Sequence, residues 1–299
     1  MMSFYKALAF IYAHPLSRGH GVSSLIRFFR WQIMTRSLNM PVIIPFVNAT
    51  RLIAERGIIC GSGTYYVGLL EFEHMAFVLH YLRPKDLFID VGANIGLFTL
   101  LAAGVVGAQS VCIEPIPQTY QRLLDNVNIN RLQNLVKAQN IGLSDTSCKL
   151  QFTTNHDAVN YVTTEFKRNN NIAEVEVRTL DSIVQNQVPE LIKIDVEGFE
   201  TKVIEGGQRT FSNNQGPNAV LMELRGHGSR YGFNEQDLHR RMLEYGYGAF
   251  VYDPISRELN LWRENDEGKF GDMLYIRQIE KAKSRVREAS PFRILGKAI

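Results

Sequence analysis

The sequence predicts an α/β protein built on a doubly wound, Rossmann-like, mostly parallel sheet, with a helical extension at its N-terminus. Three observations lead to this fold class. The strand-length apolar run Leu87–Val91 is followed by a glycine turn and an apolar segment of helix length, the same alternation continues as far as residue 224, and residues 1–56 differ in charge from the rest. A strand, a glycine turn and a helix form half of a βαβ unit, and repeated units build parallel sheets covered on both faces.

The N-terminal extension, residues 1–60, is basic and predicted to be helical. Within residues 23–38, apolar side chains recur near helical spacing and arginines occupy the remaining surface: the apolar residues are Leu25, Phe28, Phe29 and Ile33, and the basic ones are Arg27, Arg30 and Arg36. This pattern predicts an amphipathic helix. Such a helix could pack on the main domain or dock on an anionic membrane surface, and both interpretations stay open.

The main domain, residues 61–280, alternates strands and helices. A helix over 71–82 ends before Pro84, because a residue that precedes proline is disfavoured in the α region. The remaining expected elements are strands at 87–91, 110–114, 135–141, 191–196, 219–224, 248–252 and 273–276, helices at 97–106, 118–130 and 234–245, and a β-hairpin of 150–154 with 174–179. The hairpin is an insertion near 147–180 with a polar loop at Asn169–Asn171, and residues 281–299 form a basic, peripheral C-terminal tail.

Composition argues against several classes of protein. Hydrophobic residues make up 45% and charged residues 21% of the 299, which is globular usage. The three cysteines, Cys60, Cys112 and Cys148, include no close pair, so neither a disulfide framework nor a cysteine zinc site is supported. No apolar stretch approaches the ~20 residues of a membrane span. We therefore expect a cytoplasmic protein.

Charge is distributed unevenly along the chain. Residues 1–56 carry a net charge of +6 and residues 280–299 carry +4, which leaves −7 between them because the whole chain carries +3. Basic ends around an acidic core do not favour nucleic acid as a partner. An acidic core would accept a cationic small ligand.

A glycine turn at the end of the first sheet strand is the strongest functional signal. Asp90-Val91-Gly92-Ala93-Asn94-Ile95-Gly96 lies where open α/β sheets bind ligands, outside the carboxyl ends of the strands. Its Gly-x-x-x-Gly spacing departs from the dinucleotide and phosphate-loop motifs. Instead, Asp90 would attract a positively charged group such as an ammonium.

Acids follow the next two strands as well. Glu114 closes the second strand, where a carboxylate can bind ribose hydroxyls, and Asp145 follows the third, where it could accept a hydrogen bond from an adenine amino group. Each also has a purely structural interpretation, as a helix cap, a surface carboxylate and a turn residue respectively. Together they suit an adenosyl ligand with a sulfonium and an amino-acid tail; the expected cofactor-binding residues are Asp90, Gly92, Asn94, Gly96, Glu114 and Asp145.

The chain resembles the class I S-adenosylmethionine-dependent methyltransferases, and among them the FkbM-type family, over roughly residues 65–224. The residues that carry the resemblance are Phe88–Gly96, Glu114-Pro115, Gly142–Asp145, Thr179–Asp181 and Ile192–Glu200. The resemblance implies a seven-stranded sheet with its last strand antiparallel and S-adenosyl-L-methionine as cofactor. It also implies O-methylation of a hydroxyl on a sugar, glycan or other natural-product acceptor.

Methyl transfer from a sulfonium is an in-line displacement, to which a base can add ~10²- to 10⁴-fold. The candidate catalytic residues are Asp195, Glu197, Glu223 and His227. The three acids are predicted at adjacent strand ends, where they could form a base cluster or a hard-cation site. We favour a carboxylate base without metal. Arg225 could pair with an anionic acceptor or neutralise Glu223.

Two other functions use the same features. A nicotinamide-dependent oxidoreductase would share the βαβ layout and Glu114, but the middle glycine of its motif is missing. A nonenzymatic adapter would use the basic arm to bind membrane or a partner and keep a lapsed cofactor fold. Acceptor contacts are expected from residues 1–70, 155–172 and 226–233, because loops and appendages usually supply them.

Overall fold

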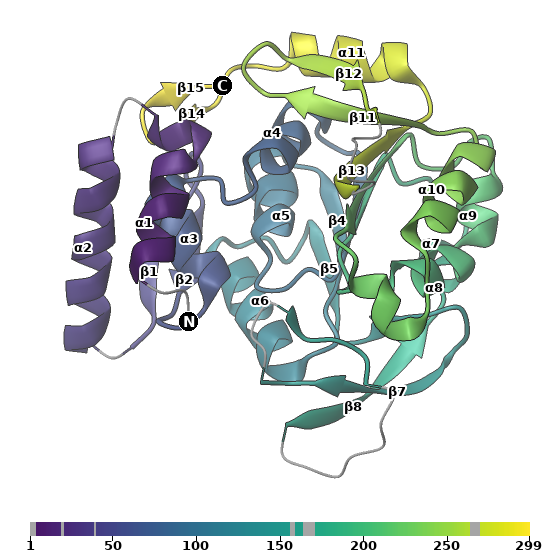
Figure 1. Cartoon of the computed structure of the whole chain (residues 1–299), viewed down its shortest axis with the longest axis horizontal. Helices are drawn as coiled ribbons and strands as arrows, with labels where there is room; N and C mark the ends of the chain where they lie inside the picture. The colour runs from purple at the N-terminus through teal and green to yellow at the C-terminus, as the bar shows by residue number, and fades with distance from the viewer. Residues whose placement is uncertain (1–3, 19–20, 39, 156–158, 164–170, 264–269) are drawn as a thin grey trace.

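The computed structural model describes residues 4–18, 21–38, 40–155, 159–163, 171–263 and 270–299 (Figure 1). A central eight-stranded sheet runs in the order β12-β11-β13-β10-β9-β3-β4-β5. The strands are β3 (Leu87–Val91), β4 (Gln109–Ile113), β5 (Val136–Gln139), β9 (Leu191–Ile194), β10 (Ala219–Leu224), β11 (Gly248–Asp253), β12 (Glu258–Leu261) and β13 (Gly271–Ile276). The polar loop predicted at Asn169–Asn171 lies outside the described residues except for Asn171.

The sheet confirms the predicted fold class. Strands β10, β9, β3, β4 and β5 are mutually parallel, and β13, the last strand of this sheet along the chain, is antiparallel to β10. The sheet has eight strands and not seven, because β12 pairs with β11 as a hairpin at its edge. The chain leaves β3 toward β4 and β5 and returns on the other side at β9, so β3 and β9 flank a topological switch point.

Helices cover both faces of the sheet (Figure 1). Side chains alternate across β3, so Phe88 belongs to one hydrophobic core and Ile89 to the other. The first core includes α4 (Phe72–Tyr81), α5 (Leu97–Thr99) with its π-helical continuation η2 (Leu100–Val106), α6 (Pro117–Ile129) and α11 (Ile279–Glu288). The second includes α7 (Leu180–Val184), α8 (Glu200–Glu205), α9 (Gln208–Ser212) and α10 (Glu235–Glu244).

A small second sheet forms the predicted insertion. Strands β7 (Cys148–Thr153) and β8 (Ile172–Arg178) pair antiparallel, and β6 (Gly142–Leu143) pairs parallel to β8. Phe152 and Val162 of this insertion share a small core with Phe199, which follows β9. The insertion therefore packs at the carboxyl end of the main sheet.

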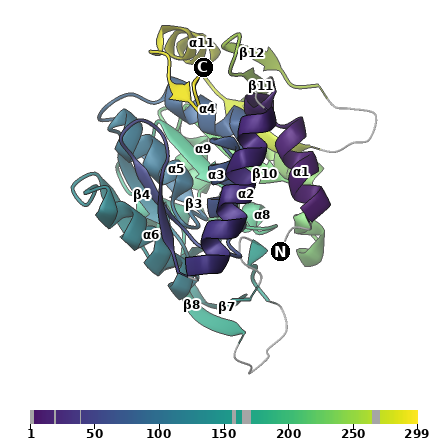
Figure 2. The ribbon, with the colours of Figure 1, turned by 90° about the vertical axis from the view of Figure 1, so that its left-hand side faces the viewer.

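The N-terminal segment contains α1 (Phe4–Ala13), η1 (Pro15–Ser17), α2 (Gly21–Leu38), the hairpin of β1 (Val42–Pro45) with β2 (Arg51–Ala54), and α3 (Ile59–Val67). Helices α1 and α2 lie side by side at one edge of the molecule (Figure 2). Of the four apolar residues predicted to share a face of α2, Phe28 is buried, whereas Leu25, Phe29 and Ile33 are exposed. None of the described helices is both long and apolar enough to cross a membrane.

The C-terminal segment differs from the peripheral tail that we expected. Helix α11 packs on α4, where Ala282 and Val286 are fully buried, and Arg285 pairs with Asp86. The strands β14 (Arg293–Ile294) and β15 (Lys297–Ala298) then form a short hairpin. The difference arises because α11 is amphipathic. Its buried residues Ala282 and Val286 are four positions apart and so share one face, while the charged face stays in water.

Candidate functional site

Gly92 brings the ends of β3 and β9 together. It has a φ of +78°, and a Cβ at this position would lie 1.8 Å from the carbonyl oxygen of Asp195. The N–H groups of Gly92 and Ala93 both donate to the carbonyl of Ile113 at 3.0 Å, which ties the turn to β4 as well. No side chain fits there, so the turn requires glycine at this position.

A cavity lies where these strand ends meet, at the switch point. Its walls come from the glycine turn, the ends of β4 and β9, and the insertion; they include Gly92, Asn94, Glu114, Ile116, Phe152, Val162, Asp195, Glu197 and Phe199. The cavity encloses about 60 Å³ as the side chains stand. Ligand sites usually measure ~300–1,000 Å³. A ligand of nucleoside size therefore requires the wall to move.

Glu114 is buried in this cavity wall and bound by two backbone amides. Its Oε2 accepts the N–H of Asn94 and its Oε1 accepts the N–H of Ile116, both at 3.0 Å. Burial raises the pKa of Glu114 to about 7, although these two N–H donors oppose the shift. Each carboxylate oxygen keeps a second lone pair for a hydroxyl group.

Asp90 does not line the cavity. It lies behind the glycine turn with no exposed surface, and Thr99 Oγ1 donates to its Oδ2 at 2.7 Å. Its Oδ1 has no partner among the described residues. Burial raises the pKa of Asp90, against the opposing charge of Lys193. The structure therefore places Asp90 off the cavity wall, with its hydrogen-bond partner Thr99 in α5.

Asp195 is paired with a buried lysine that sequence reasoning missed. Lys193 Nζ donates to Asp195 Oδ2 at 2.7 Å and lies 4.7 Å from the centre of the Phe98 ring. Burial tends to raise the pKa of Asp195, but the Lys193 ammonium outweighs it and holds that pKa below its ordinary value. A lysine inside the apolar strand Leu191–Ile194 was the available signal, since buried lysine needs an anionic partner.

Glu197 and His227 form a close pair. His227 Nδ1 lies 2.8 Å from Glu197 Oε2, and the imidazole is partly exposed while the carboxylate is largely buried. Gly198 makes the approach possible, because a Cβ there would lie 2.5 Å from the His227 backbone. Burial and the charge of Asp195 raise the pKa of Glu197, and His227 opposes them.

Glu200 accepts hydrogen bonds from the backbone of the loop that follows β9. Its Oε1 accepts the N–H groups of Val196 and Gly198, both at 3.1 Å. It is almost fully buried, and burial raises its pKa to about 7. Glu200 therefore acts on the shape of the loop and not on the cavity.

Glu223 joins the acids from the end of β10. Arg225 Nη1 lies 2.9 Å from Glu223 Oε1, and Arg225 also pairs with Asp272. Burial, together with the charge of Asp195 and a hydrogen bond to it, raises the pKa of Glu223 well above its ordinary value. Arg225 opposes this shift with its positive charge.

A second hollow lies near the same acids. A groove of about 510 Å³ lies between the N-terminal segment and strands β11 and β13, with Glu71, His74, Arg225 and Asp272 among its polar walls. A narrow space bordered by Glu71, His74 and Asp272 continues to Lys193, Asp195 and Glu223. Asp195 thus borders both the cavity and this narrow space, which shares Glu71, His74 and Asp272 with the groove.

The structure does not bring Asp145 and Gly96 to the cavity. Asp145 accepts from Lys202 Nζ at 2.8 Å and from Ser144 Oγ at 3.0 Å, and it lies outside the wall. Gly96 begins α5 with a φ of +89°. Asn94 does border the cavity, with its Oδ1 accepting the N–H of Ile95.

Two groups of side chains in the described part of the chain have the spacing of a cation site. Glu197, Glu223 and His227 place one ligand atom each within 4.8 Å of one another, and so do Glu71, His74 and Asp272. Both groups mix oxygen and nitrogen donors and are partly exposed. Either group could bind a proton or a divalent ion. A chelator distinguishes the two cases, because it removes a metal ion but not a proton.

The fold and the cavity together define a Rossmann-like methyltransferase. The "Methyltransferase FkbM domain" profile matches residues 90–248, which is more than half of the chain. The chain belongs to this family, as the motifs predict.

Two curated relatives are methyltransferases. "Hexuronic acid methyltransferase AglP" of Haloferax volcanii is 28% identical over 162 residues, which cover 52% of this chain and 62% of the relative. "Methyltransferase sdnD" of Sordaria araneosa is 28% identical over 169 residues, covering 45% and 65% respectively. The chain thus spans less than two thirds of either relative.

Solved structures are more distant. TYW2 of P. horikoshii in complex with MeSAdo is 13% identical over 80% of this chain and 72% of that one, with a TM-score of 0.39.

Proposed function

We propose that the protein is an S-adenosylmethionine-dependent O-methyltransferase that methylates a hydroxyl group of a sugar or glycan. The observation that carries this proposal is the position of Asp195 between the switch-point cavity and the polar groove, beside the Glu197–His227 pair. Two ligands that meet at this point would have their reacting atoms next to a base.

The cavity offers an acceptor and apolar walls that would fit an adenosyl cofactor. Glu114 offers carboxylate oxygens for ribose hydroxyls, and Ile116, Phe152 and Val162 supply apolar walls for a flat base. The acids at the inner end suit a sulfonium. When bound, S-adenosylmethionine supplies an electrophilic methyl group; the chain's own residues orient the acceptor and take up its proton.

His227 is the base that the geometry favours. Asp195 is held ionised by Lys193, and its lowered pKa makes it a weak base, whereas the raised pKa of Glu223 keeps a proton there. Glu197 fixes the His227 ring through Nδ1, which leaves Nε2 for the acceptor hydroxyl. Glu197 would then stabilise the imidazolium that forms. Base catalysis of this kind contributes ~10²- to 10⁴-fold.

The groove suits a hydroxylated, anionic acceptor. Arg225 is half exposed there, and Glu71, His74 and Asp272 offer hydrogen bonds to hydroxyl groups. A guanidinium binds a carboxylate with two parallel hydrogen bonds. A sugar acid fits both features, in agreement with the relative described as a hexuronic acid methyltransferase.

Calorimetry with S-adenosylhomocysteine tests the cofactor site. We expect binding by the wild-type protein and at least roughly tenfold weaker binding by Glu114→Gln, because a hydrogen bond to a charged group contributes ~1.5–3 kcal/mol. Glu174→Gln is the matched control, since Glu174 is exposed and pairs only with Lys149 among the interactions described. Equal affinities for all three proteins would remove the ribose assignment, and no binding by folded wild-type protein would remove the cofactor.

Transfer of labelled methyl groups to glucuronic-acid-containing oligosaccharides tests the reaction. His227→Gln should lower kcat by ~10²-fold or more without weakening cofactor binding. If chelation abolishes activity and Mg²⁺ restores it, then Glu197, Glu223 and His227 hold a cation and the base assignment is wrong. A saturable fluorescence change with reduced nicotinamide would instead favour an oxidoreductase.

A further inference from the structure

Helix α2 carries two side-chain stripes, and only one of them is covered. The covered stripe packs against α3 and consists of Ser24, Phe28, Trp31 and Thr35. The open stripe consists of Val22, Leu25, Ile26, Phe29 and Ile33, with exposed fractions of 39–74%. Steps of three and four residues place these five side chains on one face. A contiguous exposed apolar face of this kind marks an interaction surface.

The charges around the open stripe favour an anionic partner. Residues 1–54 contain six lysines and arginines and no aspartate or glutamate. By helical spacing, Arg30 lies beside the stripe on α2, whereas Arg36 lies on the stripe's own face, three residues beyond Ile33. A second copy of this surface would bring arginines against arginines. An anionic lipid bilayer instead offers negative headgroups to the arginines and hydrocarbon to the stripe.

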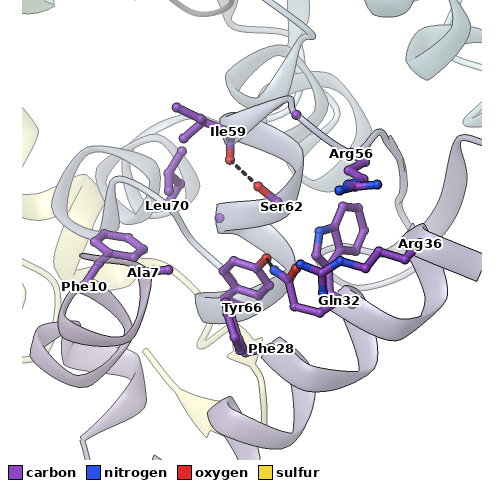
Figure 3. Close-up of a pocket in the computed structure, with 13 residues that line it drawn as sticks. Ala7, Phe10, Phe28, Gln32, Arg36, Arg56, Ile59, Ser62, Tyr66 and Leu70 are labelled. Carbon is purple, nitrogen blue, oxygen red and sulfur yellow. Dashed lines mark hydrogen bonds between the residues drawn. The ribbon is translucent and has the colours of Figure 1, made fainter. Parts of the chain in front are cut away.

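A cavity of about 400 Å³ lies between α1, α2 and α3, and its two ends differ in chemistry (Figure 3). Ala7, Phe10 and Leu70 line one side, whereas Arg36 and Arg56 lie at the other. Within the described residues, neither guanidinium takes part in an ion pair or a hydrogen bond. An apolar chamber with two arginines at one end suits the chain and headgroup of an anionic lipid.

We propose that the N-terminal arm (α1, α2 and α3) docks on an anionic bilayer, with the open stripe of α2 in the headgroup boundary and Arg36 and Arg56 on a lipid headgroup. Phe10 and Leu70 border both this cavity and the polar groove. Docking therefore places the groove beside the membrane surface. The proposal is independent of the methyl-transfer chemistry.

Co-sedimentation of the full-length protein with vesicles tests the stripe. We expect binding to phosphatidylcholine vesicles that contain about one third phosphatidylglycerol, on the order of tenfold or more tighter than to phosphatidylcholine alone, and weakened by salt. Phe29→Glu/Ile33→Glu should abolish it. Ile255→Glu/Leu261→Glu changes two equally exposed apolar residues of the β11–β12 edge and should leave binding intact.

A second variant tests the cavity between α1, α2 and α3. Arg36→Gln/Arg56→Gln should lose the preference for anionic vesicles, whereas Arg131→Gln/Arg293→Gln, which removes two exposed arginines elsewhere, should keep it. Matching thermal unfolding midpoints show that all variants fold. Equal binding to both vesicles, wild-type binding by Phe29→Glu/Ile33→Glu, or a dimer that this variant dissociates without any vesicle binding would each overturn the proposal.

Discussion

Gly92 shows how the absence of one side chain shapes the site. The turn passes so close to the Asp195 carbonyl that a methyl group at residue 92 would overlap it. This contact is independent of any ligand. The turn motif therefore reflects strand packing at the switch point as much as binding.

Gly92→Ala should destabilise the protein by about 2–4 kcal/mol, because backbone strain and overpacking add. Gly246→Ala is the control, since Gly246 has a φ of +86° but nothing within 4 Å of a Cβ, so strain acts alone. Denaturant unfolding measures both. Equal losses for the two variants would mean that the contact with Asp195 relaxes freely.

Glu200 should make stability depend on pH. Its pKa rises from an ordinary 4.5 to about 7 on folding, so the folded state binds the extra proton between these values and stability falls as pH rises through that window. Glu200→Gln keeps an acceptor oxygen for Val196 and Gly198 without the buried charge. We expect the variant to gain stability relative to wild type from pH 5 to pH 8, by up to ~3 kcal/mol. Denaturant unfolding at several pH values measures this. If the difference in unfolding free energy between the variant and wild type is the same at every pH, the expectation is wrong.

Residue environments also explain which site predictions the sequence could not decide. Glu114 reaches the cavity because it directly ends β4, a local property. Asp145 does not, because Lys202, 57 positions later, pairs with it. Asp90 lies on the far side of its own turn. Partners distant in sequence determine such orientations, and no local motif encodes them.

Among the elements, the insertion supplies part of the cavity wall. Phe152 and Val162 both line the cavity, and a Cβ on Gly142 would lie 2.8 Å from the Phe152 ring. The Phe152 ring therefore packs directly against the backbone of Gly142 in β6. The enclosed volume is too small for a nucleoside until this wall moves.

Phe152→Ala should open the wall. We expect faster association of S-adenosylhomocysteine and weaker equilibrium binding, because the barrier and an apolar contact are lost together. Leu150→Ala is the control: Leu150 lies on the same strand and in the same small core but not on the cavity. Stopped-flow mixing and calorimetry measure the two effects. An unchanged association rate for S-adenosylhomocysteine would mean that Phe152 does not limit entry of the ligand.

Helices and strands were predicted well where the spacing of the apolar residues fits only one of the two. The expected strand over 219–224 matches β10 residue for residue, and α10 begins after Asn234, whose side chain accepts from Gln236 N–H. The apolar residues predicted for α2 include Phe28 of the covered stripe and Leu25, Phe29 and Ile33 of the open one, because the helix has apolar residues on two sides. Periodicity identifies stripes but cannot say which one finds a neighbour.

At the scale of the whole molecule, the order of strands could be anticipated from the family resemblance, whereas the additions could not. Strand β12 exists only through its hairpin with β11, and α11 is held by Ala282, Val286 and Arg285 against α4. Both additions extend the sheet or cover it without touching the switch point. The additions therefore depend on contacts of their own and not on the βαβ alternation that predicts the central strands.

Asp195 borders the switch-point cavity and also the narrow space that shares Glu71, His74 and Asp272 with the groove. If the proposed reaction holds, cofactor and acceptor occupy separate hollows that approach each other at this one residue, so neither has to leave before the other can bind. The proposal then predicts a random-order kinetic mechanism and not an obligatory one.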